Sequence, residues 1–263
     1  MSKCISETEL FNDLIPLLKK FVKSERYLIT LGGSHGKGVS DNLSDYDFRV
    51  YSDEYVQCDI WNSAAKELKD KVFDLRNKEI IVDDTWYRNI GETDEIIQLW
   101  VSGNGVPQPF IWCVWGYNIL TDIFNQTIII DPFNIATKWK EDLSVYPAKL
   151  KSAIITKHIK SMRYWRNDYH FKNKVERADY VFLSSLAIKL IHDIFQVIYA
   201  LNENYYPGDG NNMLFIKGFT ILPNNFENRV YDVLYPNNKE VNLFSRQFDK
   251  LVLLIDDVLG LCE

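Results

Sequence analysis

Two aspartates, Asp45 and Asp47, stand two residues apart in the segment SDYDFRVYS (residues 44–52), where polar and apolar side chains alternate. A β-strand repeats every two residues, so both carboxylates lie on one face, roughly 7 Å apart along the chain. Two carboxylates about 4 Å apart would repel by roughly 4 kcal/mol at an effective dielectric constant of about 20. A divalent cation removes that repulsion, and Mg²⁺ is suitable because it binds one or two carboxylates together with substrate phosphates.

A glycine-serine turn precedes these aspartates. The apolar run Tyr27–Leu31 predicts a strand, and it stops at Gly32, Gly33 and Ser34. Glycines allow backbone N–H groups to approach an anion closely, and the serine hydroxyl adds a further donor. Lys37 follows in the connection, where it is either a phosphate contact or a solvated loop lysine. The segment from residue 26 to 52 therefore suits a metal-bound polyphosphate.

This segment resembles a known family. Gly33-Ser34, Gly38 and the run Ser44-Asp45-Tyr46-Asp47 match the GS-x(n)-SDxD signature of the DNA polymerase beta-like nucleotidyltransferase superfamily. Its members transfer a nucleoside monophosphate from a nucleoside triphosphate to a hydroxyl, and many small bacterial members modify aminoglycoside or lincosamide antibiotics. The resemblance implies that Asp45 and Asp47 hold one or two Mg²⁺ ions, with ATP as the expected donor. It also implies that Gly33 and Ser34 hold the phosphates.

The same resemblance implies a third carboxylate on a neighbouring strand, as a metal ligand or as the general base. Glu95 is the first choice, because it opens the strand-like run EIIQLWV (residues 95–101). Asp83 and Asp84, inside a second strand-like run at residues 79–86, are the alternatives. Asp131, directly after an expected strand at residues 127–130, is expected to form a turn rather than to bind metal.

Arg49 departs from the family pattern, because many relatives carry an apolar residue at this point of the strand. Its guanidinium falls on the same face as the two aspartates. There it could balance their charge, contact a phosphate or compete with the metal. Together with the uncertain third carboxylate, Arg49 leaves open a non-catalytic member that binds a nucleotide or a partner chain, as in a toxin–antitoxin pair.

The remaining pattern predicts two domains. Residues 1–141 are expected to form an α/β nucleotidyltransferase domain with a mixed sheet, including helices at residues 7–24 and 60–76. Ser6 and Glu9 form a potential capping box at the first of these helices. Residues 142–263 are expected to form an all-α helical bundle, with helices at residues 147–171, 177–202, 224–234 and 241–261.

Two features of the helical half bear on the substrate. The segment from Ala200 to Lys217 resembles a loop found in some bacterial nucleotidyltransferase-like proteins, and this likeness makes Lys217 a candidate nucleotide contact. Residues 149–177 are rich in lysine and arginine with interleaved aromatic residues, a pattern typical of base stacking and phosphate binding. A solvated helix face is the alternative for most of these lysines.

Composition limits the remaining possibilities. A net charge of −6 and a pI near 5.4 do not indicate a general nucleic-acid-binding protein. The four cysteines form no CxxC pair, no apolar run reaches the length of a membrane span, and the N-terminal residues do not resemble a signal peptide. A cytoplasmic enzyme with a small-molecule hydroxyl acceptor is expected; a hydroxyl on a protein or a tRNA is the alternative. The oligomeric state stays open.

Overall fold

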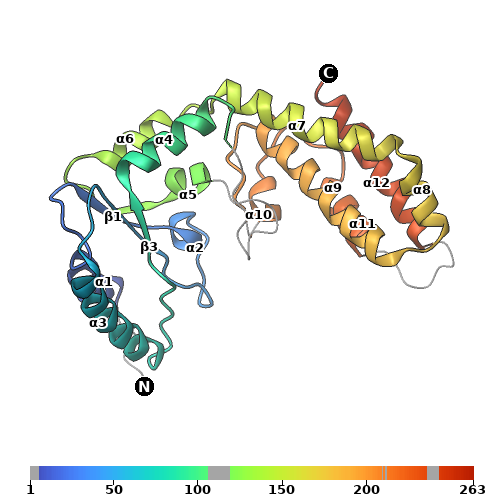
Figure 1. The fold of residues 1–263 in the computed structure, drawn as a ribbon. Coiled ribbons are helices and arrows are strands. Elements are labelled where there is room, and N and C mark those ends of the chain that lie inside the picture. The colour runs from blue at the N-terminus through green and yellow to red at the C-terminus, as the bar shows by residue number, and fades with distance from the viewer. Residues whose placement is uncertain (1–5, 106–118, 209, 211, 236–242) are drawn as a thin grey trace. The chain divides into compact units, whose positions relative to one another are not determined.

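The computed structural model describes residues 6–105, 119–208, 210, 212–235 and 243–263 (Figure 1). The chain divides into two compact units. The sheet unit comprises Met1–Leu99 and Ile119–Val145, and the helical unit comprises Trp100–Asn118 and Tyr146–Glu263. The domain boundary expected between residues 141 and 142 lies shortly before the observed boundary between Val145 and Tyr146. Each unit is described by itself below.

The sheet unit contains a mixed four-stranded sheet in the order β3-β2-β1-β4. Its strands are β1 (Tyr27–Leu31), β2 (Phe48–Ser52), β3 (Trp86–Asn89) and β4 (Thr127–Ile130). β1 pairs antiparallel with β2 and with β4, whereas β3 runs parallel to β2. The expected mixed α/β architecture is therefore confirmed, together with the expected strands at residues 27–31 and 127–130.

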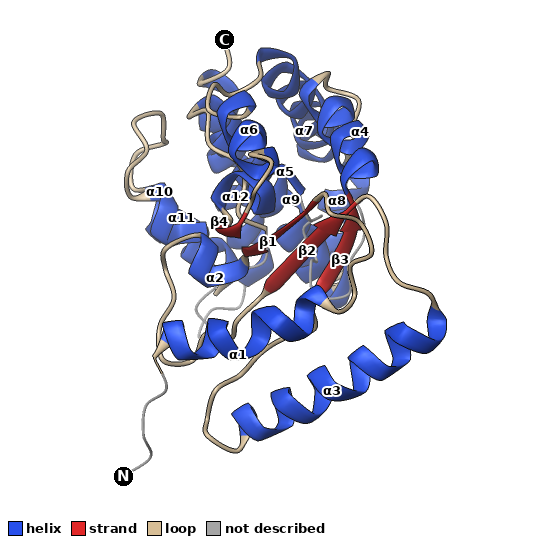
Figure 2. Cartoon of the chain, turned by 90° about the vertical axis from the view of Figure 1, so that its left-hand side faces the viewer, coloured by secondary structure: helices blue, strands red, loops and turns tan. Residues whose placement is uncertain are grey.

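One face of this sheet is apolar and is covered by two helices, α1 (Glu7–Lys19) and α3 (Cys58–Arg76) (Figure 2). Side chains of both helices pack with Ile29, Phe48 and Val50 in one buried cluster. The expected capping box is present at the start of α1, where the Ser6 side chain accepts a hydrogen bond from the backbone N–H of Glu9. The two helices predicted at the N-terminal half are therefore confirmed.

The residues that alternate with this apolar set form a buried polar layer. Thr30, Arg49 and Gln126 are almost completely buried. The Thr30 hydroxyl donates to Oε1 of Gln126 at 2.6 Å, and the Tyr51 hydroxyl donates to the same oxygen at 3.2 Å. Helices α5 (Ile119–Asn125) and α6 (Ile135–Asp142) flank Gln126 and β4 in the chain. Arg49 and Tyr51 thus lie on the opposite face from Phe48 and Val50, as the strand period predicts.

Two predicted strands are wrong. Residues 95–101 belong to helix α4 (Ile90–Val101), and residues 79–85 precede β3 rather than forming a strand. The buried positions of α4 are Ile90, Thr93, Ile97 and Trp100, a spacing of three to four residues that fits a helix and not a strand. The Asn89 side chain accepts a hydrogen bond from the backbone N–H of Glu92 at 3.1 Å, which caps the first turn.

The helical unit contains α7 (Ala148–Asn167), α8 (Tyr169–Glu176), α9 (Tyr180–Leu201), α10 (Asn212–Ile216), α11 (Phe226–Leu234) and α12 (Leu243–Gly260). α9 supplies the largest share of the buried core, which packs against side chains of the other helices. The single helix predicted over residues 147–171 is wrong, because it ends at Asn167. Asp168 adopts an extended conformation there and its side chain caps α8 by accepting from the backbone N–H of His170.

Helix α9 is long and apolar enough to cross a membrane, with a mean hydropathy of 1.6 over its most apolar window. Slightly more than half of that window, 56%, is buried inside the structure. Leu190, Ile194 and Ile198 are completely or almost completely buried in the helical core. Packing in the helical core therefore accounts for part of the apolar character of this helix.

Candidate metal centre

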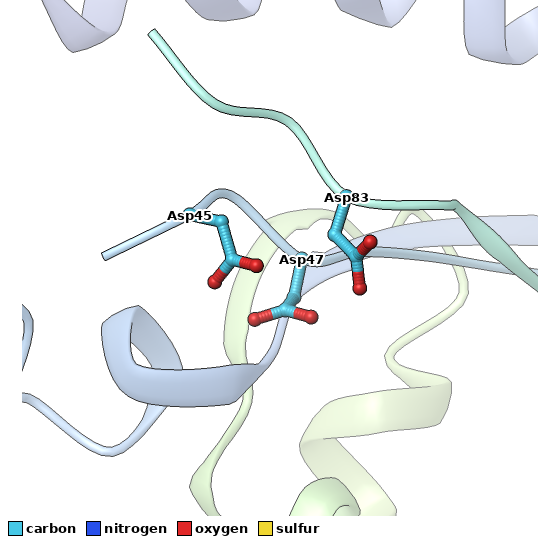
Figure 3. A group of neighbouring side chains, drawn as sticks. All are labelled: Asp45, Asp47 and Asp83. Carbon is cyan, nitrogen blue, oxygen red and sulfur yellow. The ribbon is translucent and has the colours of Figure 1, made fainter. Parts of the chain in front are cut away.

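Three carboxylates gather at one end of the sheet. Asp45 and Asp47 lie in the segment that leads into β2, and Asp83 lies in the segment that leads into β3 (Figure 3). One carboxylate oxygen from each of the three lies within 4.8 Å of the others. Asp45 and Asp47 are half-buried and Asp83 is exposed, so the group is open to solvent on one side.

The parallel pairing of β2 with β3 explains why Asp83 completes this group. Parallel strands enter the sheet from the same edge, so the residues before β3 lie beside the residues before β2. The backbone N–H of Tyr46 donates to the carbonyl of Ile81 at 2.9 Å, and the N–H of Asp83 donates to the carbonyl of Tyr46 at 3.2 Å. Both backbone groups of Tyr46 are thus paired with the segment before β3, which fixes Asp83 next to Asp45 and Asp47.

The other predicted acidic residues have different surroundings. Glu95 lies on the exposed side of α4 and is outside the group of three, so the structure brings Asp83, rather than Glu95, to Asp45 and Asp47. Asp84 is exposed beside Asp83 but does not belong to the group. Asp131 accepts hydrogen bonds from the backbone N–H groups of Ile135 and Thr137, at 2.7 and 3.0 Å, and the expectation that it forms a turn is confirmed.

The glycine turn packs directly against Asp47. β1 and β2 are antiparallel, so the end of β1 meets the beginning of β2, and the N–H of Gly32 donates to the carbonyl of Asp47 at 2.8 Å. Gly33 has a φ of +57°, and a Cβ atom on it would lie 1.7 Å from Oδ2 of Asp47. Only glycine permits both this backbone conformation and this close approach.

The short helix α2 (Gly33–Gly36) carries the other predicted phosphate contacts. The Ser34 hydroxyl is buried and has no hydrogen-bond partner among the residues that the structure describes. His35 stacks on Tyr46, with ring centroids 4.2 Å apart, which holds α2 against the Asp45–Asp47 segment. Lys37 is half-buried at the end of α2, whereas Lys217 is exposed after α10 in the helical unit.

The electrostatic environment of Asp47 is unusual for a carboxylate. Burial raises the pKa of Asp47 to about 6, against a smaller opposite effect of Arg49. The neighbouring carboxylates of Asp45, Asp122 and Asp83 raise this pKa further. A carboxyl group that is destabilised as an anion by its acidic neighbours gains from a bound cation.

Arg49 is held in a network that the sequence did not reveal. Its Nε atom donates to Oδ2 of Asp122 at 3.0 Å, and its Nη2 atom lies 3.6 Å from Oδ1 of Asp47. Asp122 also accepts from Nη1 of Arg88 at 3.3 Å, and both guanidinium groups lie over the ring of Trp86. The alternation around β2 predicted the face on which Arg49 lies, but no local pattern pointed to Asp122, on α5, as its partner.

The donor set fits a hard divalent cation. Three carboxylates within reach of one another offer only oxygen ligands, which Mg²⁺ and Ca²⁺ prefer to the nitrogen and sulfur ligands of zinc sites. The exposed side of the group leaves room for water or for the oxygen atoms of a second ligand. The geometry therefore suits a cation that bridges the protein and an anionic ligand.

Comparison with known proteins adds one family. Residues 112–210 match a family described as a domain of unknown function (DUF4037). This match includes Asp122 and Asp131 but not Asp45, Asp47 or Asp83. No curated protein matches the chain.

Proposed function

We propose that the protein is a metal-dependent nucleotidyltransferase that moves a nucleoside monophosphate from a nucleoside triphosphate to a hydroxyl. The observation that carries this proposal is the contact between the Gly33 turn and Asp47, within a group of three carboxylates. A tight glycine turn beside a carboxylate cluster supplies backbone donors for phosphates and oxygen ligands for a cation in one place. The likeness to the DNA polymerase beta-like superfamily at residues 33–47 supports the same reaction and fold.

Each residue has a definite part in this proposal. Asp45, Asp47 and Asp83 hold one or two Mg²⁺ ions, which when bound neutralise phosphate charge. Gly33 and Ser34 donate hydrogen bonds to the phosphates, and the unpartnered Ser34 hydroxyl is the donor that most needs an acceptor. Asp83, the most exposed of the three, takes the role first assigned to Glu95 and removes the proton of the acceptor hydroxyl. The acceptor oxygen then bonds to the α-phosphorus as the bond to pyrophosphate breaks.

ATP is the proposed donor, and a hydroxyl of an aminoglycoside or lincosamide antibiotic is the proposed acceptor. The acceptor class follows from the family likeness and from the acidic composition, which favours a cationic substrate. Lys37, at the end of α2 in the sheet unit, is proposed as an additional nucleotide contact.

The test is transfer of label from each nucleoside triphosphate, labelled on its α-phosphate, with Mg²⁺ and a panel of these antibiotics. We expect a labelled acceptor and free pyrophosphate with the wild-type protein, and a loss of at least about 100-fold in Asp47→Asn. The matched control is Asp131→Asn, which alters an acidic residue of the same unit outside the carboxylate group. If the wild-type protein releases no pyrophosphate with any of the acceptors, the proposal is contradicted.

Helix α7 favours a second candidate acceptor, a hydroxyl of RNA. The helix contains six basic residues and no acidic one, although the whole protein has a net charge of −6. Lys157, Lys160 and Arg163 are exposed and have no ion-pair partner among the described residues. Tyr164 is exposed beside them, at 59% of its surface, where a base could stack on its ring.

A further inference from the structure

The guanidinium group of Arg49 lies between two carboxylates, one of which belongs to the candidate metal centre. Its side chain is only 4% exposed, so its charge is compensated by protein groups rather than by water. Its Nε atom donates to Oδ2 of Asp122 at 3.0 Å, and its Nη2 atom lies between the two carboxylates, 3.5 Å from Oδ1 of Asp122 and 3.6 Å from Oδ1 of Asp47. Arg49 therefore makes its shortest hydrogen bond to Asp122 and forms a longer ion pair, without a hydrogen bond, with Asp47.

The surroundings of Arg49 keep it in this position. The Trp86 ring lies 4.2 Å from the guanidinium carbon, which restricts the plane of the group. A Cβ atom on Gly32 would lie 2.7 Å from Oδ1 of Asp122 and 3.0 Å from Nη2 of Arg49, so the turn packs onto this ion pair. Arg88 donates to the same oxygen atom of Asp122, Oδ2, at 3.3 Å. The Asp122 carboxylate is thus fixed by two arginines and the turn.

Without its hydrogen bond to Asp122, the Arg49 guanidinium is close enough to form hydrogen bonds with the Asp47 carboxylate. Arginine binds a carboxylate best through two parallel hydrogen bonds, and such a contact would occupy both oxygen atoms of Asp47. A cation needs at least one of those oxygen atoms. The position of Arg49 therefore decides whether Asp47 is available as a metal ligand.

We propose that Asp122 is a positioning residue that holds the Arg49 guanidinium away from Asp47, so that the Asp47 carboxylate stays open to a divalent cation. Asp122 does not contact the cation in this scheme and acts only through Arg49. The inference rests on the proposed metal centre. It assigns a function to the one acidic side chain, among the residues that the structure describes, that is buried beside the centre without belonging to the carboxylate group.

A double-mutant cycle separates this role from a general effect of charge. If Asp122 acted only by its negative charge, Asp122→Asn would weaken cation binding by the same factor whether or not residue 49 is arginine. If Asp122 acts by holding Arg49, the substitution has an effect only while Arg49 is present. The comparison therefore needs wild type, Asp122→Asn, Arg49→Met and the double variant.

The experiment is a titration of each full-length protein with Mn²⁺, followed by electron paramagnetic resonance of the free ion, without nucleotide or acceptor. We expect Asp122→Asn to weaken Mn²⁺ binding at least about tenfold in the wild-type background and less than about twofold in the Arg49→Met background. Arg49→Gln serves as the second background if Arg49→Met does not fold, and far-UV circular dichroism checks the fold of each variant.

Three results would overturn the inference, and they are distinguishable. Equal factors in both backgrounds, or no weakening in Asp122→Asn, would refute the role of Asp122 while the metal centre stands. Failure of the wild-type protein to bind Mn²⁺ would refute the centre itself and the inference with it.

Discussion

A Cβ atom on residue 33 would lie 1.7 Å from Oδ2 of Asp47, and this relationship ties the glycine turn to the candidate metal centre. Gly33→Ala must therefore move either the turn or the Asp47 side chain. We expect Mn²⁺ binding to weaken at least about tenfold and nucleotidyl transfer to fall by a similar factor or more. An alanine at a φ of +57° also costs about 1–2 kcal/mol of stability.

Gly38→Ala is the matched control for this prediction. Gly38 also has a positive φ, +68°, but a Cβ atom on it would meet no atom within 4 Å. We expect a similar loss of stability of about 1–2 kcal/mol, measured by thermal melting, without a change in Mn²⁺ binding. Equal loss of binding in both variants would mean that backbone strain, and not the approach to Asp47, is responsible.

The identity of the third carboxylate gives a second prediction. Asp83 belongs to the carboxylate group, and Glu95 lies outside it on α4. Asp83→Asn removes one charged ligand and should weaken Mn²⁺ binding at least about tenfold, because each charged oxygen ligand adds to the affinity of a hard cation. Glu95→Gln should leave binding within about twofold. The opposite pattern in the same titration would restore Glu95 as the ligand.

The part of the candidate metal centre formed by the glycine turn and the two aspartates before β2 could be predicted from local sequence patterns. The strand at residues 27–31, the glycine turn and the two aspartates before β2 lie close together in the sequence. Steric rules for glycine and the two-residue period of a strand therefore predict their geometry. The same period predicted that Arg49 and Phe48 lie on opposite faces of the sheet, as the burial of Phe48 with Ile29 now confirms.

The other side of the centre depends on pairing between distant segments. Asp83 joins the group only because β3 runs parallel to β2, which no local pattern indicates. Glu95 was misplaced because the run EIIQLWV contains strand-forming residues, yet its buried positions follow a helical spacing that begins at Ile90. Asp122 was missed for a similar reason, because a single acidic residue between two apolar runs gives no sign of a buried arginine partner.

The pKa of Asp47, raised to about 6, predicts a pH-dependent response to Mg²⁺. Because the folded pKa lies above the ordinary carboxyl value, the metal-free protein loses stability as the pH rises toward 6 and Asp47 becomes charged. Mg²⁺ binds the charged form, so its stabilising effect should be full above about pH 7 and should fall as the pH drops below about 6. At about pH 5 only about a tenth of Asp47 is ionised, which weakens apparent binding about tenfold.

Thermal melting with and without Mg²⁺ at about pH 5 and about pH 7.5 measures this effect. Asp47→Asn is the control, and its melting temperature should not respond to Mg²⁺ at either pH. An equal Mg²⁺ shift of the wild-type protein at both pH values would contradict the assignment of Asp47 as a ligand.

The basic face of α7 predicts salt-dependent binding of RNA. Replacing Lys157, Lys160 and Arg163 by glutamate should weaken the binding of a fluorescent single-stranded RNA at least about tenfold, because each cation that contacts a phosphate releases counterions. The dependence of log K on log salt should become shallower by about two to three units. Fluorescence anisotropy at several salt concentrations measures both quantities.

Lys66→Glu with Lys69→Glu is the control for this face. Both lysines are exposed on α3 in the sheet unit, and they lie on a helix that also carries acidic residues. Their replacement should change RNA affinity by less than about threefold. If the two sets of variants weaken binding equally, net charge alone is responsible. If the wild-type protein binds no RNA, the proposal of an RNA acceptor is refuted.

A buried carboxylate in the helical unit gives the last prediction. Asp193 accepts hydrogen bonds from Nδ1 of His158, the hydroxyl of Ser161 and Nζ of Lys189, at 2.6 to 2.7 Å. Burial raises the pKa of Asp193, but these three donors outweigh it and hold the pKa below its ordinary value. The charged form therefore stabilises the folded protein at neutral pH, and this stabilisation is lost only as the pH falls below the ordinary carboxyl range.

Asp193→Asn should destabilise the helical unit by about 2–4 kcal/mol, because a buried ion pair loses its acceptor while the partly exposed Lys189 recovers some solvation. Ser161→Ala removes one hydrogen bond from the same carboxylate and should cost only about 1 kcal/mol. Urea unfolding followed by far-UV circular dichroism measures both. Equal and small losses in the two variants would mean that the three donors to Asp193 contribute no more to stability than solvent contacts do, and that α7 and α9 are joined by apolar packing alone.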